Sequence, residues 1–338
     1  MEWSKILTAF QIQPEEMEQI TERLFKIRAN SQQFALKKSR LHPEDIGRWL
    51  AIYQLIEQKQ VHGFIPLFLT NNKQPFYQEQ SDIYYLMPWV ERSYTEQPVD
   101  EFATVIHAMG HLHASTMANH QITSLKQNKS TLEQQFQQEL TSYRDQMLTY
   151  VRYFEAKRFM SPSELQICMY YRDFEQIFTQ IERWQEIYLA ELEETEQMKY
   201  TLCHGNLKNS HYIITTTNTY LLNWESAVMT SPTFDLVTYY QHLFQFHDCD
   251  LDKIKESFSI YCRYIDLTDY EKSLLVLQML SPANWIQSVK KCAQPARRKN
   301  IIKDSIEIEK QYRKLLFSFE LQEFILQTLK REQIEETN

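Results

Sequence analysis

The sequence has 338 residues with 36 basic and 44 acidic side chains, a net charge of −8, and its 43% of hydrophobic residues is typical of a folded protein. A chain of this length builds one large domain or two ordinary ones, each with its own core. Because phosphate backbones attract positively charged surfaces, the acidic balance argues against a protein whose main task is to bind nucleic acid.

The first 90 residues predict a small α+β lobe. A helix-like stretch extends to about Glu22, and the runs 24–29 and 34–38 predict a hairpin. A helix begins with Pro43 at its first position and ends near Gly63, because apolar residues recur at every third or fourth position between them. Further extended segments are predicted at residues 64–69, 75–77 and 83–87.

Residues 91–338 predict a larger lobe that is mostly helical. Amphipathic Glu/Gln-rich stretches indicate long helices over about 130–157 and 163–199, and a last helix covers about 304–330. One non-helical island, residues 200–225, interrupts them. Two runs of β-branched and aromatic residues in this island predict a hairpin with its turn at 216–219.

Glycine and cysteine usage excludes several kinds of site. The four glycines, Gly47, Gly63, Gly110 and Gly205, lie far apart, whereas glycine-rich nucleotide-binding loops need several within about eight residues. The five cysteines are widely spaced and form no C-x-x-C pair, so we expect reduced thiols and no structural zinc site.

The sequence shows no segment that predicts insertion into a membrane. The N-terminal residues lack the basic and apolar regions of a signal peptide, and the longest apolar cluster, around 274–280, is much shorter than the roughly 20 residues of a membrane span. We therefore expect a protein made in the cytoplasm.

The island carries the motif that indicates the family. It contains Cys203-His204-Gly205-Asn206, followed by His211 and then Leu222-Asn223-Trp224-Glu225, and Phe234-Asp235-Leu236 comes shortly after it. These segments resemble the H-G-D-x-x-x-x-N, I-D-W-E and D-L motifs of aminoglycoside-phosphotransferase-like kinases, most closely of the CotS/YutH branch associated with the bacterial spore coat. The resemblance extends to a lysine strand at 34–38, an interlobe hinge at 87–91 and the first helix of the large lobe at 107–114.

The resemblance implies a two-lobed, protein-kinase-like α+β fold, with a reduced N-terminal lobe over residues 1–90 and a large helical lobe over 91–338 that carries the catalytic hairpin at 200–225. In such kinases one Asp accepts the proton of the substrate hydroxyl, and an Asn and a second Asp hold magnesium. Here these positions are Asn206, His211 and Asn223. All three depart from the family pattern.

The three departures remove the chemistry of the site. The amide of Asn206 is not a base near neutral pH, which alone costs roughly 10²–10⁴-fold in rate. Magnesium prefers anionic oxygen, so an Asn223 amide beside a His211 imidazole weakens its site. We expect a pseudokinase that has no catalytic residues, holds no metal and needs no cofactor.

The resemblance assigns vestigial or structural roles to other residues. Lys37 is the lysine that would contact nucleotide phosphates, with Lys38 as the alternative register. Its acidic partner is left open between Glu44 and Glu57. His204 and Asp235 are expected to brace the catalytic loop. Glu225 is either a substitute metal ligand or a surface or helix-capping glutamate.

The functional prediction from the resemblance is a spore-coat-associated structural or scaffolding protein, made in the mother-cell cytoplasm and retained in the coat by other coat proteins. One alternative is an active small-molecule kinase that uses displaced ligands such as Glu225, Asp235 or Asp248. Another is a regulator that binds ATP without transferring phosphate. The basic cluster 290–299 is either a solvated helix end or a docking site for an acidic partner.

Overall fold

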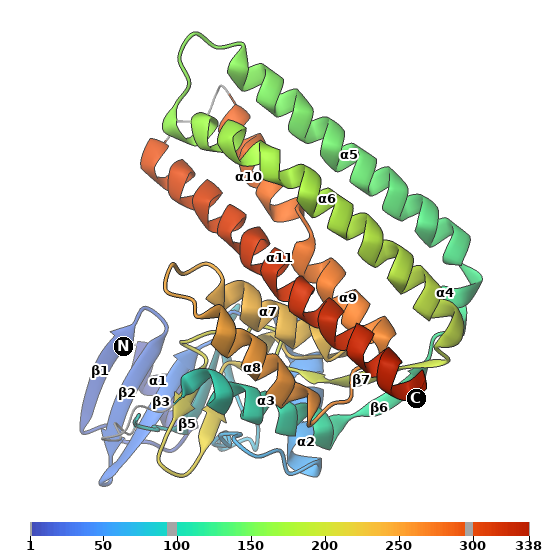
Figure 1. The fold of residues 1–338 in the computed structure, drawn as a ribbon. Helices are drawn as coiled ribbons and strands as arrows, with labels where there is room; N and C mark the ends of the chain where they lie inside the picture. The colour runs from blue at the N-terminus through green and yellow to red at the C-terminus, as the bar shows by residue number, and fades with distance from the viewer. Residues whose placement is uncertain (1, 93–99, 295–299, 338) are drawn as a thin grey trace. The chain divides into compact units, whose positions relative to one another are not determined.

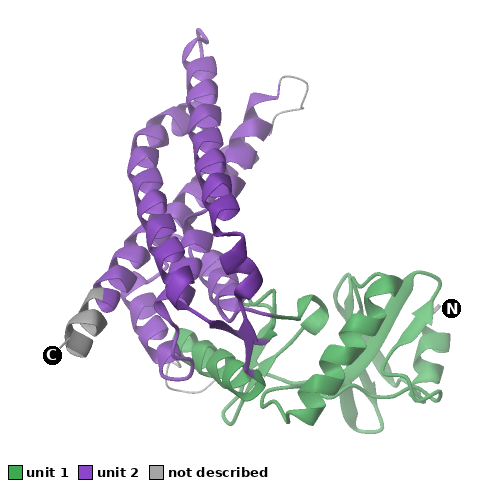
Figure 2. Cartoon of the chain, turned by 90° about the vertical axis from the view of Figure 1, so that its right-hand side faces the viewer, with its two compact units in different colours: residues 1–116, 202–229 green, residues 117–201, 230–338 purple. Residues whose placement is uncertain are grey.

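The computed structural model describes residues 2–92, 100–294 and 300–337 (Figure 1). The chain forms two compact units (Figure 2). Unit 1 consists of residues 1–116 and 202–229, and unit 2 of residues 117–201 and 230–338. The units differ from the predicted lobes, 1–90 and 91–338, because unit 1 also includes residues 91–116 and the catalytic hairpin.

Unit 1 combines a sheet with three helices and the hairpin. Its elements are α1 (Glu2–Ala9), β1 (Glu16–Thr21), β2 (Leu24–Ala29), β3 (Gln32–Lys38), the 3-10 turn η1 (Pro43–Asp45), α2 (Ile46–Gln58), β4 (Tyr77–Glu79), β5 (Asp82–Pro88), α3 (Glu101–Thr116), β8 (Tyr212–Ile214), β9 (Thr219–Leu221) and the 3-10 turn η2 (Trp224–Ser226). Strands β7 (Gln197–Cys203) and β10 (Val228–Thr230) pass from one unit to the other along the chain.

The five-stranded sheet of unit 1 has the order β1-β2-β3-β5-β4, and its neighbouring strands are antiparallel. Successive side chains of a strand point to opposite faces. Leu36 and Leu86, which pair across β3 and β5, belong to the core that includes Ile6 and Phe10 at α1. On the opposite face Lys37 lies directly across from Tyr85, whose ring contacts Trp49 of α2. The pleat of β3 thus places Lys37 on the α2 side of the sheet.

The predicted helix through Glu22 is wrong. The helix ends at Ala9, and Glu16–Thr21 forms the edge strand β1, in which Met17 pairs with Ile27 of β2. Gln11 has a positive φ of 59° and Pro14 follows it, a combination that ends the helix. Helix propensity of Glu and Met is a weak preference that strand pairing overrides.

Other predictions of local structure in unit 1 have mixed outcomes. The hairpin of 24–29 with 34–38 is confirmed as β2 and β3, and the hairpin around 216–219 is confirmed as β8 and β9. The segment 64–69 is not a strand, although the amide of Phe68 donates to the carbonyl of Leu86 at 2.8 Å.

Unit 2 is mainly helical. Its elements are β6 (Ala118–Gln121), α4 (Thr123–Gln127), α5 (Lys129–Glu155), α6 (Pro162–Glu194), α7 (Thr233–Leu243), α8 (Leu251–Cys262), α9 (Asp269–Leu280), α10 (Ala283–Ala293) and α11 (Ile301–Thr337). The strand β6 pairs antiparallel with the first residues of β7. The helix predicted over 163–199 ends at Glu194, and the chain continues as β7 from Gln197.

Long helices form the core of unit 2. Trp184 of α6 is fully buried and donates from its indole nitrogen to Gln322 of α11 at 2.7 Å. Capping boxes begin α6 at Ser161 and α9 at Thr268, which satisfies amide groups that a helix start leaves unpaired. Among the described residues, no helix combines the length and apolar character that crossing a membrane requires.

Candidate functional site

The catalytic hairpin of unit 1 is fixed by backbone geometry. Gly205 has a φ of +76°, and a Cβ there would lie 2.2 Å from the carbonyl oxygen of Ser226. Gly63 has a φ of +75°, and a Cβ there would lie 2.2 Å from the carbonyl oxygen of Thr219. The carbonyl of Gly63 accepts from the amide of Leu221 at 2.9 Å. Only glycine fits two such approaches. The loop before β8 and the strand β9 are therefore held in one shape.

His204 links the two segments of the hairpin. The residue is completely buried, and its Nε2 lies 2.6 Å from the carbonyl oxygen of Leu222. Its Nδ1 accepts from the amide of Asn206 at 3.3 Å, so the ring carries its proton on Nε2. His204 thus braces the loop from within unit 1. Asp235 is buried in the first turn of α7 in unit 2, and its predicted pairing with His204 stays a prediction.

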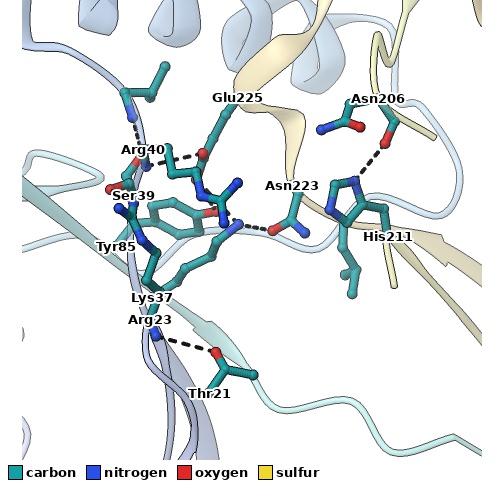
Figure 3. Close-up of polar contacts among 12 residues, drawn as sticks. Thr21, Arg23, Lys37, Ser39, Arg40, Tyr85, Asn206, His211, Asn223 and Glu225 are labelled. Atoms are coloured by element: carbon teal, nitrogen blue, oxygen red, sulfur yellow. Dashed lines mark hydrogen bonds and ion pairs between the residues drawn. The ribbon is translucent and has the colours of Figure 1, made fainter. Parts of the chain in front are cut away.

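The resemblance of the motifs assigns Asn206 and His211 to the positions of the catalytic base and of the metal-binding Asn. The Nδ1 of His211 donates to the backbone carbonyl of Asn206 at 2.6 Å, a contact drawn in Figure 3. Burial disfavours the charged imidazolium and lowers the pKa of His211 to about 3. The ring is therefore neutral at physiological pH and serves as a hydrogen-bond donor to the loop.

Lys37 is held by the residues that follow β9. Its ammonium donates to the amide oxygen of Asn223 and forms an ion pair with Oε1 of Glu225 at 3.2 Å (Figure 3). The side chains of Lys37 and Glu225 are 14% and 13% exposed. Asn223 has a φ of 66°, a left-handed conformation that Asn tolerates better than most residues.

Glu225 has further partners on both of its oxygens. The hydroxyl of Tyr85 donates to Oε1 at 3.1 Å, and the backbone amide of Arg40 donates to Oε2 at 3.2 Å. Glu225 is therefore neither a surface glutamate nor a simple helix cap. It joins β3, β5 and the turn η2 through hydrogen bonds and one ion pair.

The electrostatics of this cluster reflect burial. Desolvation lowers the pKa of Lys37 below its usual value, and the neighbouring Glu225 carboxylate opposes this shift. Burial likewise raises the pKa of the Tyr85 hydroxyl, with a further contribution from Glu225. Tyr85 is thus a neutral donor, and the Glu225 carboxylate is the negative charge that balances the Lys37 ammonium.

The residues present do not fit the magnesium ion that active kinases hold between these positions. Asn223 offers a neutral oxygen, and that oxygen accepts from an ammonium group. The imidazole of His211 is a poor ligand for a hard cation, and its Nδ1 is already engaged. Among Asn206, His211, Asn223 and Glu225, only Glu225 supplies a carboxylate, and both its oxygens are hydrogen-bonded.

The partner of Lys37 was not predicted from the sequence. Glu44 and Glu57, the two acidic residues considered on the α2 side, are both exposed. Glu225 takes this place instead, 188 positions further along the chain. The strand register separates Lys37 from Lys38, since Lys38 lies on the other face and pairs with Asp82, but it gives no signal for Glu225.

Sequence comparison assigns the family. Residues 18–255, more than half of the chain, match the phosphotransferase enzyme family, so the protein belongs to that family. No curated protein matches the chain by sequence.

Solved structures share the fold at low sequence identity. An aminoglycoside phosphotransferase from Alicyclobacillus acidocaldarius superimposes with a TM-score of 0.70 at 13% identity, covering 96% of each chain. A spectinomycin phosphotransferase bound to AMP gives a TM-score of 0.56 at 12% identity, covering 93% of this chain and 95% of its own. A microcompartment-associated aminopropanol kinase gives 0.53 at 12% identity, covering 90% and 93%. These similarities confirm the expected aminoglycoside-phosphotransferase-like fold.

Proposed function

We propose that this phosphotransferase-family protein is a pseudokinase that acts as a structural or scaffolding protein of the spore coat. The absence of phosphoryl transfer and the coat role are separate parts of this proposal. The first rests on the contacts of the site and the second on the resemblance of the motifs at 203–211 and 222–225 to the CotS/YutH branch.

The observation that carries the first part is the direct contact between Lys37 and Asn223. In an active kinase the lysine that corresponds to Lys37 contacts nucleotide phosphates, and the residue that corresponds to Asn223 is a metal-binding carboxylate. Here the two side chains satisfy each other. Glu225 balances the charge of Lys37 at 3.2 Å, so this ion pair is neutral without nucleotide or metal.

The two alternatives make specific demands on these contacts. An active kinase that uses Glu225 as a metal ligand must first break its bonds to Lys37, Tyr85 and the Arg40 amide. An ATP-binding regulator needs only the lysine, and must separate it from Asn223 and Glu225. Each bond lost to reach a ligand offsets part of the binding energy.

Thermal unfolding in the presence of nucleotide tests the first part. We expect the unfolding midpoint to stay unchanged on addition of ATP, with or without magnesium. A ligand present at 100 times its Kd would stabilise the folded chain by about 2.7 kcal/mol, which such a measurement detects. A shift with ATP alone supports the regulator, and a magnesium-dependent shift with ADP formation supports the active kinase.

The variant Asn206→Asp/Asn223→Asp tests whether the site differs from that of an active phosphotransferase only in its charged groups or also in its shape. Its matched control is Asn128→Asp/Asn300→Asp, which changes the net charge equally at two exposed positions. Magnesium-dependent ATP binding by the first variant alone would show that the site keeps the shape of a phosphotransferase.

Fractionation of spores from the source organism tests the second part. We expect an antibody against this chain to detect it in the extracted coat fraction and not in the spore core. Its exclusion from the coat in mature spores would contradict the scaffolding role, whatever the outcome of the nucleotide experiment.

A further inference from the structure

Two connections at one end of unit 2 expose large apolar side chains. The first is the connection between α5 and α6, where Phe159 is 80% exposed and Met160 is 38% exposed. Lys157 and Arg158 come directly before them. A phenylalanine exposed to this degree is unusual on the surface of a folded domain, because aromatic residues are normally buried.

The second connection leads from α10 into α11. Ile302 and Ile306, one helical turn apart, are 72% and 60% exposed at the start of α11. Lys303 lies between them and is exposed, as are Lys290 and Lys291 at the end of α10. In the sequence, residues 283–303 contain six basic residues and no acidic one, although the whole chain carries −8.

These two connections lie at the same end of unit 2. Helices α6 and α11 run in the same direction, since Tyr170 stacks on Tyr312 at 3.7 Å and Trp184 bonds Gln322 further along both helices. Their starts are therefore neighbours, and Figure 1 shows both at the end of unit 2 where α5 connects to α6. The apolar-basic end is defined here by the exposed apolar residues Phe159, Met160, Leu165, Met169, Ile302 and Ile306 and the basic residues Arg158, Lys290, Lys291 and Lys303.

Two acidic side chains near this end, Glu164 and Glu307, are engaged within the chain, whereas Glu155 at the end of α5 is exposed. Glu164 is buried and holds Lys157 at 2.7 Å, and it also caps α6 through the amide of Ser161. Glu307 accepts from Gln311 at 2.7 Å. Within the described residues, Lys290, Lys291 and Lys303 are exposed and form no ion pair with a carboxylate, and the guanidinium of Arg158 lies over the ring of Phe159 at 5.3 Å.

We propose that the apolar-basic end binds the surface of an anionic lipid bilayer, with Phe159 and Ile302 entering the interface and the lysines contacting lipid headgroups. Exposed apolar groups combined with basic residues are the features that bind proteins to anionic membrane surfaces. The net negative charge of the chain opposes such binding elsewhere. The attraction must therefore come from this end.

The arrangement favours a lipid surface over an acidic protein. The apolar residues are divided between the α5–α6 connection, the start of α6 and the start of α11, and Phe159 is 80% exposed. A bilayer interface accepts separate apolar side chains without a matching groove, whereas a protein partner requires complementary pockets for each. The inference goes beyond the proposed function and does not depend on it.

Vesicle flotation tests this proposal with the full chain and no nucleotide. We expect binding to mixed phosphatidylglycerol and phosphatidylcholine vesicles and not to phosphatidylcholine alone, with binding weakened by salt. The charge variant Lys290→Gln/Lys291→Gln/Lys303→Gln is expected to lose at least tenfold in affinity, since each basic residue contributes roughly fivefold. The apolar variant Phe159→Ser/Ile302→Ser is expected to lose binding as well.

Matched variants on other surfaces control for general charge and hydrophobicity. Lys5→Gln/Lys59→Gln/Lys253→Gln removes three exposed lysines elsewhere, and Leu69→Ser/Phe246→Ser removes two exposed apolar side chains. We expect both to bind anionic vesicles like the unaltered chain. Equal binding to the two kinds of vesicle, no binding to either, or equal losses in the control variants would overturn the proposal. Binding to soluble poly-glutamate without vesicle binding would assign this end to an acidic protein instead.

Discussion

At the scale of single residues, the site is organised around one ion pair that links β3 to the turn after β9. Lys37 and Glu225 balance each other, and Tyr85 and the Arg40 amide complete the hydrogen bonding of the carboxylate. A charge that remains buried after its partner is removed costs far more than the intact pair contributes. The stability of unit 1 therefore depends on keeping both partners or removing both.

The substitution Lys37→Met is expected to destabilise the chain by about 2–4 kcal/mol, because it leaves the Glu225 carboxylate without its cation. Lys38→Met, whose partner Asp82 is more exposed, is expected to cost less than about 1 kcal/mol. Urea unfolding measures both. Adding Glu225→Gln to Lys37→Met should recover part of the loss, and a double variant less stable than the single one would contradict this account.

The buried imidazole of His211 predicts a loss of stability in acid. Its pKa is lowered to about 3 in the folded chain, against about 6.5 when unfolded. As the pH falls through this window, the unfolded chain takes up a proton that the folded chain does not. The free energy of unfolding then decreases by at most about 1.4 kcal/mol per pH unit.

The variant His211→Asn removes this titration. Between neutral pH and about pH 4, the original chain is expected to lose more unfolding free energy than the variant, because only the original chain has the His211 imidazole. Denaturant unfolding at several pH values measures it. Parallel pH profiles would show that His211 takes up its proton over the same pH range in the folded and unfolded chains.

At the scale of elements, local patterns predicted the helices and hairpins better than the contacts between them. The amphipathic pattern placed a helix at 130–157, close to the α5 bounds of Lys129–Glu155, since a helix face repeats within the segment itself. The N-terminal strand β1 was missed because its pairing with β2 decides its structure. The Lys37–Glu225 contact was missed for the same reason, as a pairing across the chain leaves no local pattern.

Gly205→Ala is expected to destabilise the chain by more than about 2 kcal/mol, because its φ is +76° and the new Cβ would lie 2.2 Å from the Ser226 carbonyl oxygen. Gly47→Ala is the matched control. A Cβ at Gly47 has open space in α2, so we expect a gain of about 0.5–1 kcal/mol. Thermal or urea unfolding compares them, and similar effects of the two substitutions would contradict the role of Gly205.

At the scale of the whole molecule, unit 1 is built from two stretches of chain that are far apart in sequence. The stretch 202–229 returns to unit 1 with Trp224, whose ring contacts Phe64 at 6.3 Å, and with Leu221 bonded to Gly63. The amide of Leu202 donates to the side chain of Thr116 at 3.0 Å, so the two ends of the excursion 117–201 meet. Folding of unit 1 therefore requires both stretches.

A fragment of residues 1–116 is expected to lack a cooperative unfolding transition, because it loses the hairpin that packs on Phe64 and Gly63. A chain in which a short Gly-Ser linker joins Thr116 to Leu202 and which ends at Met229 is expected to recover the transition, since those ends are in contact. Circular dichroism during urea titration measures both. A cooperative 1–116 fragment would show that the hairpin is dispensable.

The backbone of the catalytic hairpin is shaped by Gly205, by the His204–Leu222 bond and by the left-handed turn at residue 223. None of these depends on whether the side chains at 206 and 223 are amides or acids, and Asp tolerates a left-handed conformation much as Asn does. Codons for Asn and Asp differ at a single base. The chain thus stands two nucleotide changes from carrying both carboxylates on a retained frame, and His211 would then be the one remaining departure among the three positions.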